Sequence, residues 1–165
     1  MGNGPVTLAA ASVTLTVTSN ALIVGGPVGE AAAGSSFTKA GDGTLVLNGT
    51  NTYTGTTTVS KGTLTLGGNQ ADVRRTMTVA GTGTLRLSPL GRIGEKTKLF
   101  IDEGGQVKLD NIDPVIVRSL TVAGVTQDPY GTYGAVGSGA RTELACFSGL
   151  GMSSFAPSGT IILVR

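Results

Sequence analysis

Residues 41–47 read Gly-Asp-Gly-Thr-Leu-Val-Leu, and this phrase returns at residues 61–66 as Lys-Gly-Thr-Leu-Thr-Leu and at 81–87 as Gly-Thr-Gly-Thr-Leu-Arg-Leu. A weaker copy, Gly-Gly-Gln-Val-Lys-Leu, occupies residues 104–109. Measured at the threonine before each leucine, and at the glutamine of the last copy, the steps are 19, 21 and 22 residues. A repeat of roughly 20 residues is typical of a solenoid, in which a coil buries its apolar side only against its neighbours.

A second phrase recurs with the same period and supports the same fold. Short Thr-Val-like stretches stand at residues 58–60, 78–80, 100–102 and 121–123, and their central residues are 20, 22 and 21 positions apart. Each coil therefore contains at least two strand-like phrases. No stretch has convincing helical periodicity, so we expect an all-β protein without significant helix.

Apolar residues lie two positions apart in each copy of the first phrase, which places them on one face of a strand. Stacking of equivalent strands in parallel, at about 4.8 Å, would put these side chains in one interior column. Glycines at fixed offsets would supply the corners with positive φ. The predicted column consists of Leu45, Leu47, Leu64, Leu66, Leu85, Leu87, Val107 and Leu109.

The sequence pattern divides the chain into three parts. Residues 1–36 read as N-terminal strands and a linker that is a candidate for pairing between subunits. Residues 37–114 carry the solenoid repeats. Residues 115–165 lose the repeat, gain turn-forming residues, and are predicted to form a C-terminal β module that covers the last coil.

Composition limits the partners. Glycine accounts for 27 of 165 residues, only 13% of residues are charged, and the net charge is +2. We see no basic stripe with interleaved aromatic residues, so we expect no nucleic-acid partner. No apolar stretch reaches 18 residues, and the N-terminus lacks the features of a secretory signal, so we expect no membrane insertion and regard any export signal as already removed.

The residue types also limit the chemistry. The chain has no His and one cysteine, Cys146, which excludes Ser-His-Asp and Cys-His catalysis and a structural zinc site. We therefore expect no catalytic residues, no metal and no cofactor. Asp110 and Asp113 are a candidate calcium pair or simply a polar turn. Cys146 reads as a small buried hydrophobe, with an intermolecular link or reactive thiol as the alternative.

Both ends of the chain carry apolar, uncharged strands. The ends of a solenoid expose backbone groups that pair with further strands unless they are capped. We expect these strands to pair head to tail between subunits and so to build a filament, because such a contact does not close. The candidate self-assembly residues are Val13, Leu15, Val17, Ile161 and Leu163.

The phrases resemble the autotransporter-associated β-strand repeat, also called the passenger-associated transport repeat. Its Gly, Thr-Leu-x-Leu, Asn-x-Tyr and Thr-x-Val elements are met at Gly41, Gly43, Thr44, Leu45, Leu47, Gly49, Asn51, Tyr53, Gly55, Thr57, Val59, Gly62 and Leu64. Residues 119–125, 131–134 and 147–151 resemble the C-terminal segment that often follows such repeats. The resemblance implies a right-handed parallel β-helix that is secreted or displayed at a bacterial cell surface, and it brings no catalytic residues.

Three functions remain open. The first is a non-enzymatic extracellular structural subunit that forms a homopolymer, as a filament or matrix. The second is a surface adhesin or passenger fragment that binds a host or glycan surface. The third is a carbohydrate-active β-helix enzyme, for which the acidic residues look too scattered. The short chain shows no translocating barrel or anchor, which favours an independently exported subunit.

Overall fold

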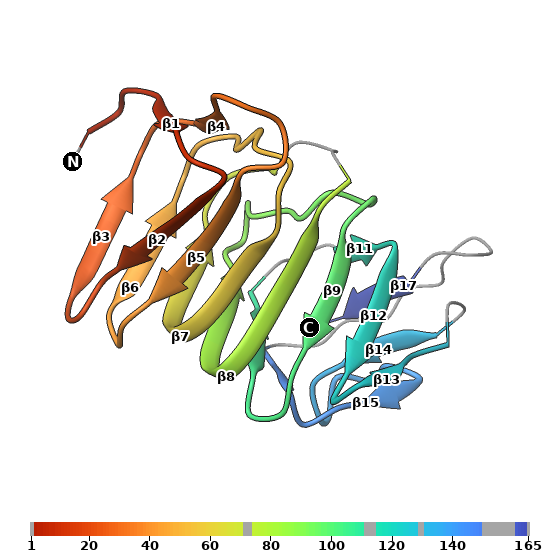
Figure 1. The fold of residues 1–165 in the computed structure, drawn as a ribbon. Coiled ribbons are helices and arrows are strands. Elements are labelled where there is room, and N and C mark those ends of the chain that lie inside the picture. The colour runs from red at the N-terminus through yellow and green to blue at the C-terminus, as the bar shows by residue number, and fades with distance from the viewer. Residues whose placement is uncertain (1, 71–73, 111–114, 129–130, 150–160, 165) are drawn as a thin grey trace.

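The computed structural model describes residues 2–70, 74–110, 115–128, 131–149 and 161–164. Over these ranges the chain forms a β-solenoid of about five turns and has no helix, and therefore no helix that could cross a membrane. The expected all-β solenoid is thus confirmed (Figure 1). Its strands are β1 (Val6–Leu8), β2 (Ser12–Thr16), β3 (Ala21–Val24), β4 (Val28–Glu30), β5 (Ser36–Ala40), β6 (Thr44–Leu47), β7 (Thr57–Leu66), β8 (Thr76–Leu87), β9 (Lys98–Ile101), β10 (Gln106–Leu109), β11 (Val115–Val117), β12 (Ser119–Val122), β13 (Val125–Thr126), β14 (Thr132–Gly134), β15 (Thr142–Glu143), β16 (Phe147–Ser148) and β17 (Ile161–Val164).

Two parallel ladders run along the solenoid. The first ladder joins β2, β5, β7, β8, β9 and β12, and the second joins β3, β6, β7, β8, β10 and β16. Strands β7 and β8 belong to both ladders because each is long and bends between its two halves, where the pairing of the two strands shifts register between Val59 and Lys61. Gly62 (φ +65°) and Gly81 (φ +59°) lie at this bend, in the left-handed region that favours glycine.

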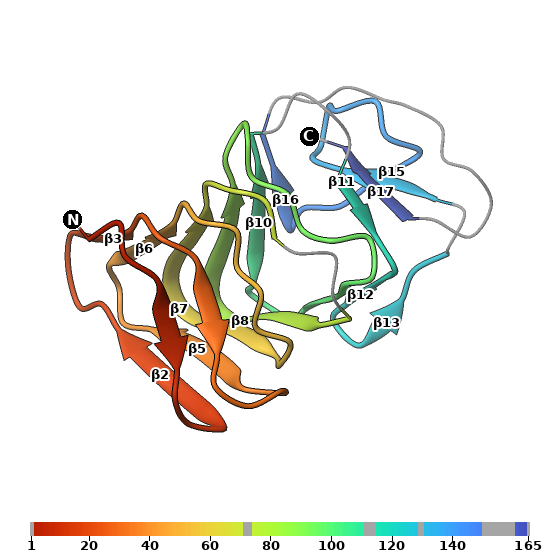
Figure 2. The ribbon, with the colours of Figure 1, turned by 90° about the horizontal axis from the view of Figure 1, so that it is seen from above.

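A third, less regular side completes each coil. Strand β1 pairs with β4, and isolated parallel bridges join Asn51 to Gln70 and Asn69 to Arg92. The coil is therefore three-sided, with two sides of regular strand and one side built mainly from turns (Figure 2).

Apolar side chains form a continuous interior column under the second ladder. Leu45, Leu64, Leu85 and Val107 follow one another in register, and each is 0% exposed. The second row of the same column is equally buried and consists of Leu47, Leu66, Leu87 and Leu109. All eight residues of the predicted column therefore lie inside the solenoid, at equivalent positions of successive coils.

The ladders extend past the domain boundaries predicted from the sequence. Strands β2 and β3 pair in register with β5 and β6, so the N-terminal strands expected in residues 1–36 form a further coil of the solenoid. Strand β12 continues the first ladder beyond residue 115. The Thr-Val-like phrase at residues 121–123 already marks this coil, whereas the first coil is hidden because Leu22 keeps the apolar pattern without the Gly-Thr signature.

The C-terminal residues close the solenoid. Strand β13 pairs with β12, and β16 pairs with β10, so each ladder ends on a short strand. Beyond them lies a four-stranded sheet in the order β11-β17-β14-β15 (Figures 1 and 2). Because β17 is paired on both sides, its residues Ile161 and Leu163 do not offer the open edge that we expected for self-assembly.

The column predicts a position-dependent cost of truncation. Leu64→Ala should lower the free energy of unfolding by about 3 kcal/mol, because the fully buried Leu64 packs between two coils. The matched variant Leu22→Ala, at the same position of the first coil but 42% exposed, should lower it by about 1 kcal/mol or less. Urea unfolding followed by circular dichroism measures both values. Equal losses would show that the first coil is as well packed as the third.

Candidate functional site

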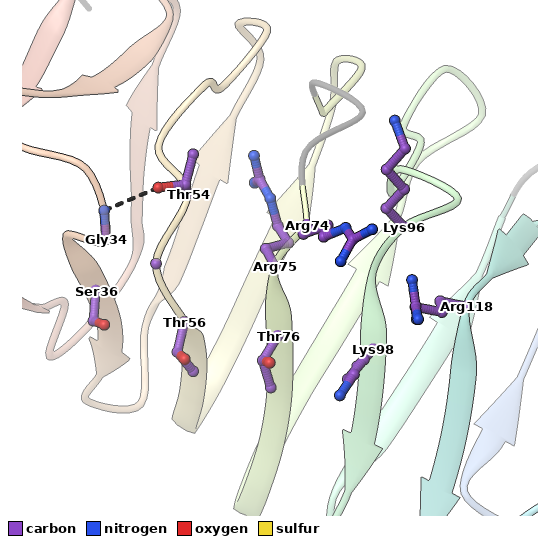
Figure 3. Close-up of a pocket in the computed structure, with 11 residues that line it drawn as sticks. Gly34, Ser36, Thr54, Thr56, Arg74, Arg75, Thr76, Lys96, Lys98 and Arg118 are labelled. Carbon is purple, nitrogen blue, oxygen red and sulfur yellow. Dashed lines mark hydrogen bonds between the residues drawn. The ribbon is translucent and has the colours of Figure 1, made fainter.

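A hollow of about 390 Å³ lies on the outer face of the solenoid, at the edge where the strands of the first ladder begin (Figure 3). We call it the basic groove. Its lining is drawn from five successive coils and consists of Gly34, Ser36, Thr54, Gly55, Thr56, Arg74, Arg75, Thr76, Lys96, Lys98 and Arg118.

Hydroxyl side chains form a row along the groove. Ser36, Thr56 and Thr76 occupy equivalent positions at the start of their strands, and Lys98 continues the row opposite Thr76 (Figure 3). All four are at least partly exposed, because alternation along each strand turns them away from the buried column. The row therefore offers hydroxyl donors and acceptors to a molecule lying across the coils.

Positive charge is concentrated in the groove. Five of the 12 cations of the chain line it, and no acidic residue is among the lining residues. Arg74, Lys96 and Arg118 are exposed and stand 22 residues apart, one on each of three successive coils. A search of the sequence for adjacent basic residues misses this row. A search for basic residues separated by one coil, about 22 positions, would have found it.

The carboxylate of Glu30 is bonded to the lining residue Thr54 and is held in place by two hydrogen bonds. One Glu30 carboxylate oxygen accepts a hydrogen bond from Thr54 Oγ1 at 2.7 Å, and the other accepts one from the Ser35 amide at 3.0 Å. Desolvation acts to raise the pKa of Glu30, but these hydrogen bonds outweigh it and hold that pKa below its usual value. Glu30 is therefore ionised at neutral pH and already engaged by its neighbours.

Arg75 anchors the floor of the groove. Its guanidinium lies 4.8 Å from the centre of the Tyr53 ring and donates to the Asn51 carbonyl at 3.1 Å and to Gln70 Oε1 at 3.3 Å. Only 4% of Arg75 is exposed, and this desolvation lowers its pKa, although the charge of the Glu30 carboxylate opposes the shift. Arg75 serves the interior, while Arg74 beside it faces solvent.

The Asn-x-Tyr element of the repeat has a structural role beneath the groove. Asn51 accepts from the Val28 amide at 2.9 Å and donates to Gln70 Oε1 at 3.0 Å, which links three coils. Tyr53 is 0% exposed, and its hydroxyl bonds to Thr57 Oγ1 at 2.7 Å. Burial raises the pKa of Tyr53, so it stays a neutral hydrogen-bonding group.

Lys39 is a buried cation that the sequence analysis did not single out. It occupies an interior position next to Val59, is 0% exposed, and donates from Nζ to the carbonyls of Ala40 (2.9 Å), Gly41 (2.7 Å) and Lys61 (3.0 Å). Desolvation lowers its pKa, and the charge of Asp42 partly opposes this shift. Lys39 therefore ties one corner of the solenoid to the corner of the next coil.

The other candidates from the sequence lie apart from the groove. Asp110 accepts a 2.6 Å hydrogen bond from Arg86 Nε, whereas Asp113 lies outside the described residues, so the calcium pair stays a prediction. The part of the chain that the structure describes contains no group of three metal-ligating side chains. Cys146 is a half-buried free thiol, and burial raises its pKa.

The two adjacent arginines give a matched test of the interior network. Arg75→Met should lower the free energy of unfolding by about 2 kcal/mol, because it removes two hydrogen bonds and the contact with the Tyr53 ring. Arg74→Met removes the same charge from an exposed position and should change it by less than about 0.5 kcal/mol. Chemical denaturation of the two variants measures the difference. A loss no greater for Arg75→Met than for Arg74→Met would contradict the role given to Arg75.

Comparison with known proteins agrees with this architecture. Residues 37–66 match the family model of the passenger-associated-transport-repeat. A stretch of 59 residues, 36% of this chain, is 46% identical to "Adhesin BmaC autotransporter" of Brucella suis biovar 1 (strain 1330), of whose length it covers about 1%. No solved structure matches the chain. The matched repeat contains the buried Leu45–Leu47 and Asn51–Tyr53 pairs described above, so over residues 37–66 the chain is similar to the autotransporter-associated repeat.

Proposed function

We propose that this chain is a non-enzymatic part of an extracellular bacterial passenger of the adhesin type, whose solenoid presents a lateral binding face. The observation that carries the proposal is the basic groove, which gathers five cations across successive coils on an otherwise weakly charged protein. The similarity to an autotransporter adhesin supports an extracellular or cell-surface location and a binding role. The rigid interior column supports the same role, because it holds the face in a fixed geometry.

A carbohydrate-active enzyme is a weaker fit to the same groove. Glycoside hydrolysis requires two carboxyl groups that converge on the scissile bond. The groove lining contains cations and hydroxyls but no Asp or Glu, and Glu30 at its side is held by two hydrogen bonds. The groove is therefore better equipped to hold a ligand than to cleave one.

Purified protein on a glycan array, paired with an assay for newly formed sugar ends, tests the proposed role. We expect binding to a subset of glycans and no release of products from the glycans that bind. Heat-unfolded protein is the control, because binding depends on the folded face. Product release would assign the chain to the enzymes instead, and an array without any bound glycan would refute the adhesin role.

Self-association is a second candidate, and a different observation favours it. Among the described residues, β2 pairs with β5 and β3 pairs with β6, and the opposite edge of β3 forms only an isolated bridge, from Val24 to Gly2. Leu22 is 42% exposed at a column position where Leu45 is 0% exposed. Val13 and Leu15 are half-buried in the same coil, and Val17 is buried. An apolar edge at the N-terminal coil supports the self-association candidate.

The covered C-terminal end changes the geometry of this second candidate. Because β13 and β16 occupy the last positions of the ladders, a head-to-tail contact would have to displace them. Contact between two N-terminal coils needs no such change. That contact is isologous and closes as a dimer rather than growing into a filament.

Sedimentation over a range of concentrations tests this assembly. We expect a concentration-dependent dimer that Leu22→Lys weakens by at least about tenfold, because the lysine places a charge in the apolar contact. Leu90→Lys is the matched control, since Leu90 is 77% exposed and lies outside the N-terminal coil. A monomer at every concentration would eliminate self-association, and fibres in electron micrographs would restore the filament.

A further inference from the structure

We infer that the basic groove binds an acidic polysaccharide, laid along the solenoid axis with its acidic groups against Arg74, Lys98 and Arg118. This inference rests on the proposed adhesin role and names its ligand class. The groove cations come from three successive coils, those of β8, β9 and β12, stacked at about 4.8 Å. The row of hydroxyls comes from the coils of β5, β7 and β8, so the two sets follow one another along the groove and meet at Arg74 and Thr76. A periodic site of this kind matches a ligand whose own charges and hydroxyls repeat.

The cations suit carboxylate or sulfate groups. Arg74 and Arg118 are exposed guanidiniums, which form paired hydrogen bonds with planar or tetrahedral oxyanions. Figure 3 shows Lys98 in line with Thr76 and Thr56. Lys98 therefore offers an ammonium group at the start of β9, and the two threonines offer hydroxyl groups at the same position of the preceding coils. A hollowed surface lined by a single sign of charge also raises the local concentration of anions.

Other polyanions fit this lining less well. Single-stranded nucleic acid gains much of its affinity from bases stacked on aromatic side chains, and the groove lining contains no aromatic residue. Tyr53 and Phe37, the aromatics closest to it along the chain, are buried. An anionic membrane surface would also require apolar side chains for insertion, and the lining contains none of the large ones.

The hydroxyl row favours sugars over acidic peptides. Thr54 already donates to Glu30, but Ser36, Thr56 and Thr76 stand along the groove at equal register (Figure 3). Sugar rings carry hydroxyls at each unit, so an acidic polysaccharide laid along the groove would meet hydroxyls on the coils of β5, β7 and β8 and cations on those of β8, β9 and β12. An acidic peptide offers charges without this regular second set of partners.

The test compares two triple variants with the same loss of charge. Arg74→Gln/Lys98→Gln/Arg118→Gln neutralises the groove. Lys61→Gln/Lys108→Gln/Arg141→Gln removes three exposed cations from other faces. Affinity is measured for heparin, which carries sulfates, for polygalacturonate, which carries carboxylates, and for neutral dextran and single-stranded DNA. Unfolding curves of both triple variants show whether each is folded. If the groove triple does not fold, the single variant Lys98→Gln replaces it in the binding assays.

We expect wild-type protein to bind heparin, polygalacturonate or both, more tightly than dextran or DNA, and more weakly as salt is raised. The groove triple should weaken that binding by about tenfold or more, and the matched triple by less than about twofold. The stronger of the two polysaccharides identifies the acidic group. Equal weakening in both triples, equal affinity for DNA, or no acidic polysaccharide bound would overturn the inference. Array binding that the groove triple leaves intact would refute this site and leave the adhesin role standing.

Discussion

In-register stacking of equivalent apolar residues is the constraint on which the whole structure depends. A coil of this solenoid is too small to bury its own interior. The side chain of Leu64 is shielded from water because Leu45 and Leu85 lie on either side of it in the adjacent coils. The same register brings backbone amides and carbonyls of adjacent strands into parallel ladders. Packing and hydrogen bonding therefore select a single alignment, and a shift of one residue would turn the leucines outward.

The stacked backbone also explains how the interior holds polar groups. Successive corners present carbonyl oxygens side by side, and the Nζ of Lys39 binds three of them. On the turn-rich side, where β1 and β4 are the strands that pair, Asn51 and Arg75 supply bonds between coils that a longer ladder would otherwise make. The polar residues of the repeat thus lie on the side where the fewest backbone hydrogen bonds join adjacent coils. Buried polar groups of this kind are tolerated because their partners are fixed in place.

The fold could be predicted because its signal is local and repeated. Gly-Thr-Leu phrases at a period near 20 residues identify both the strand faces and the neighbours of each strand. The first coil was missed because Leu22 lies in Ala-Leu-Ile-Val without the glycine signature, and the pairing of β17 could not be seen because it joins residues far apart in the chain. The groove was hidden for a related reason. Arg74, Lys96 and Arg118 are distant in sequence and become neighbours only after the register of the coils is known.

The basic groove differs from a binding site built on loops, because its cations come from three successive coils, those of β8, β9 and β12, whose relative places are set by the ladder. Duplication of one of these three coils would insert further charge and lengthen the face by one strand spacing, without redesign of the existing contacts. Loss of a coil would do the reverse. Under the proposed binding role, avidity for a long repetitive ligand would be graded in small steps by the number of coils. Recognition would then be adjusted by gain or loss of whole repeats, through unequal recombination within the repeated sequence.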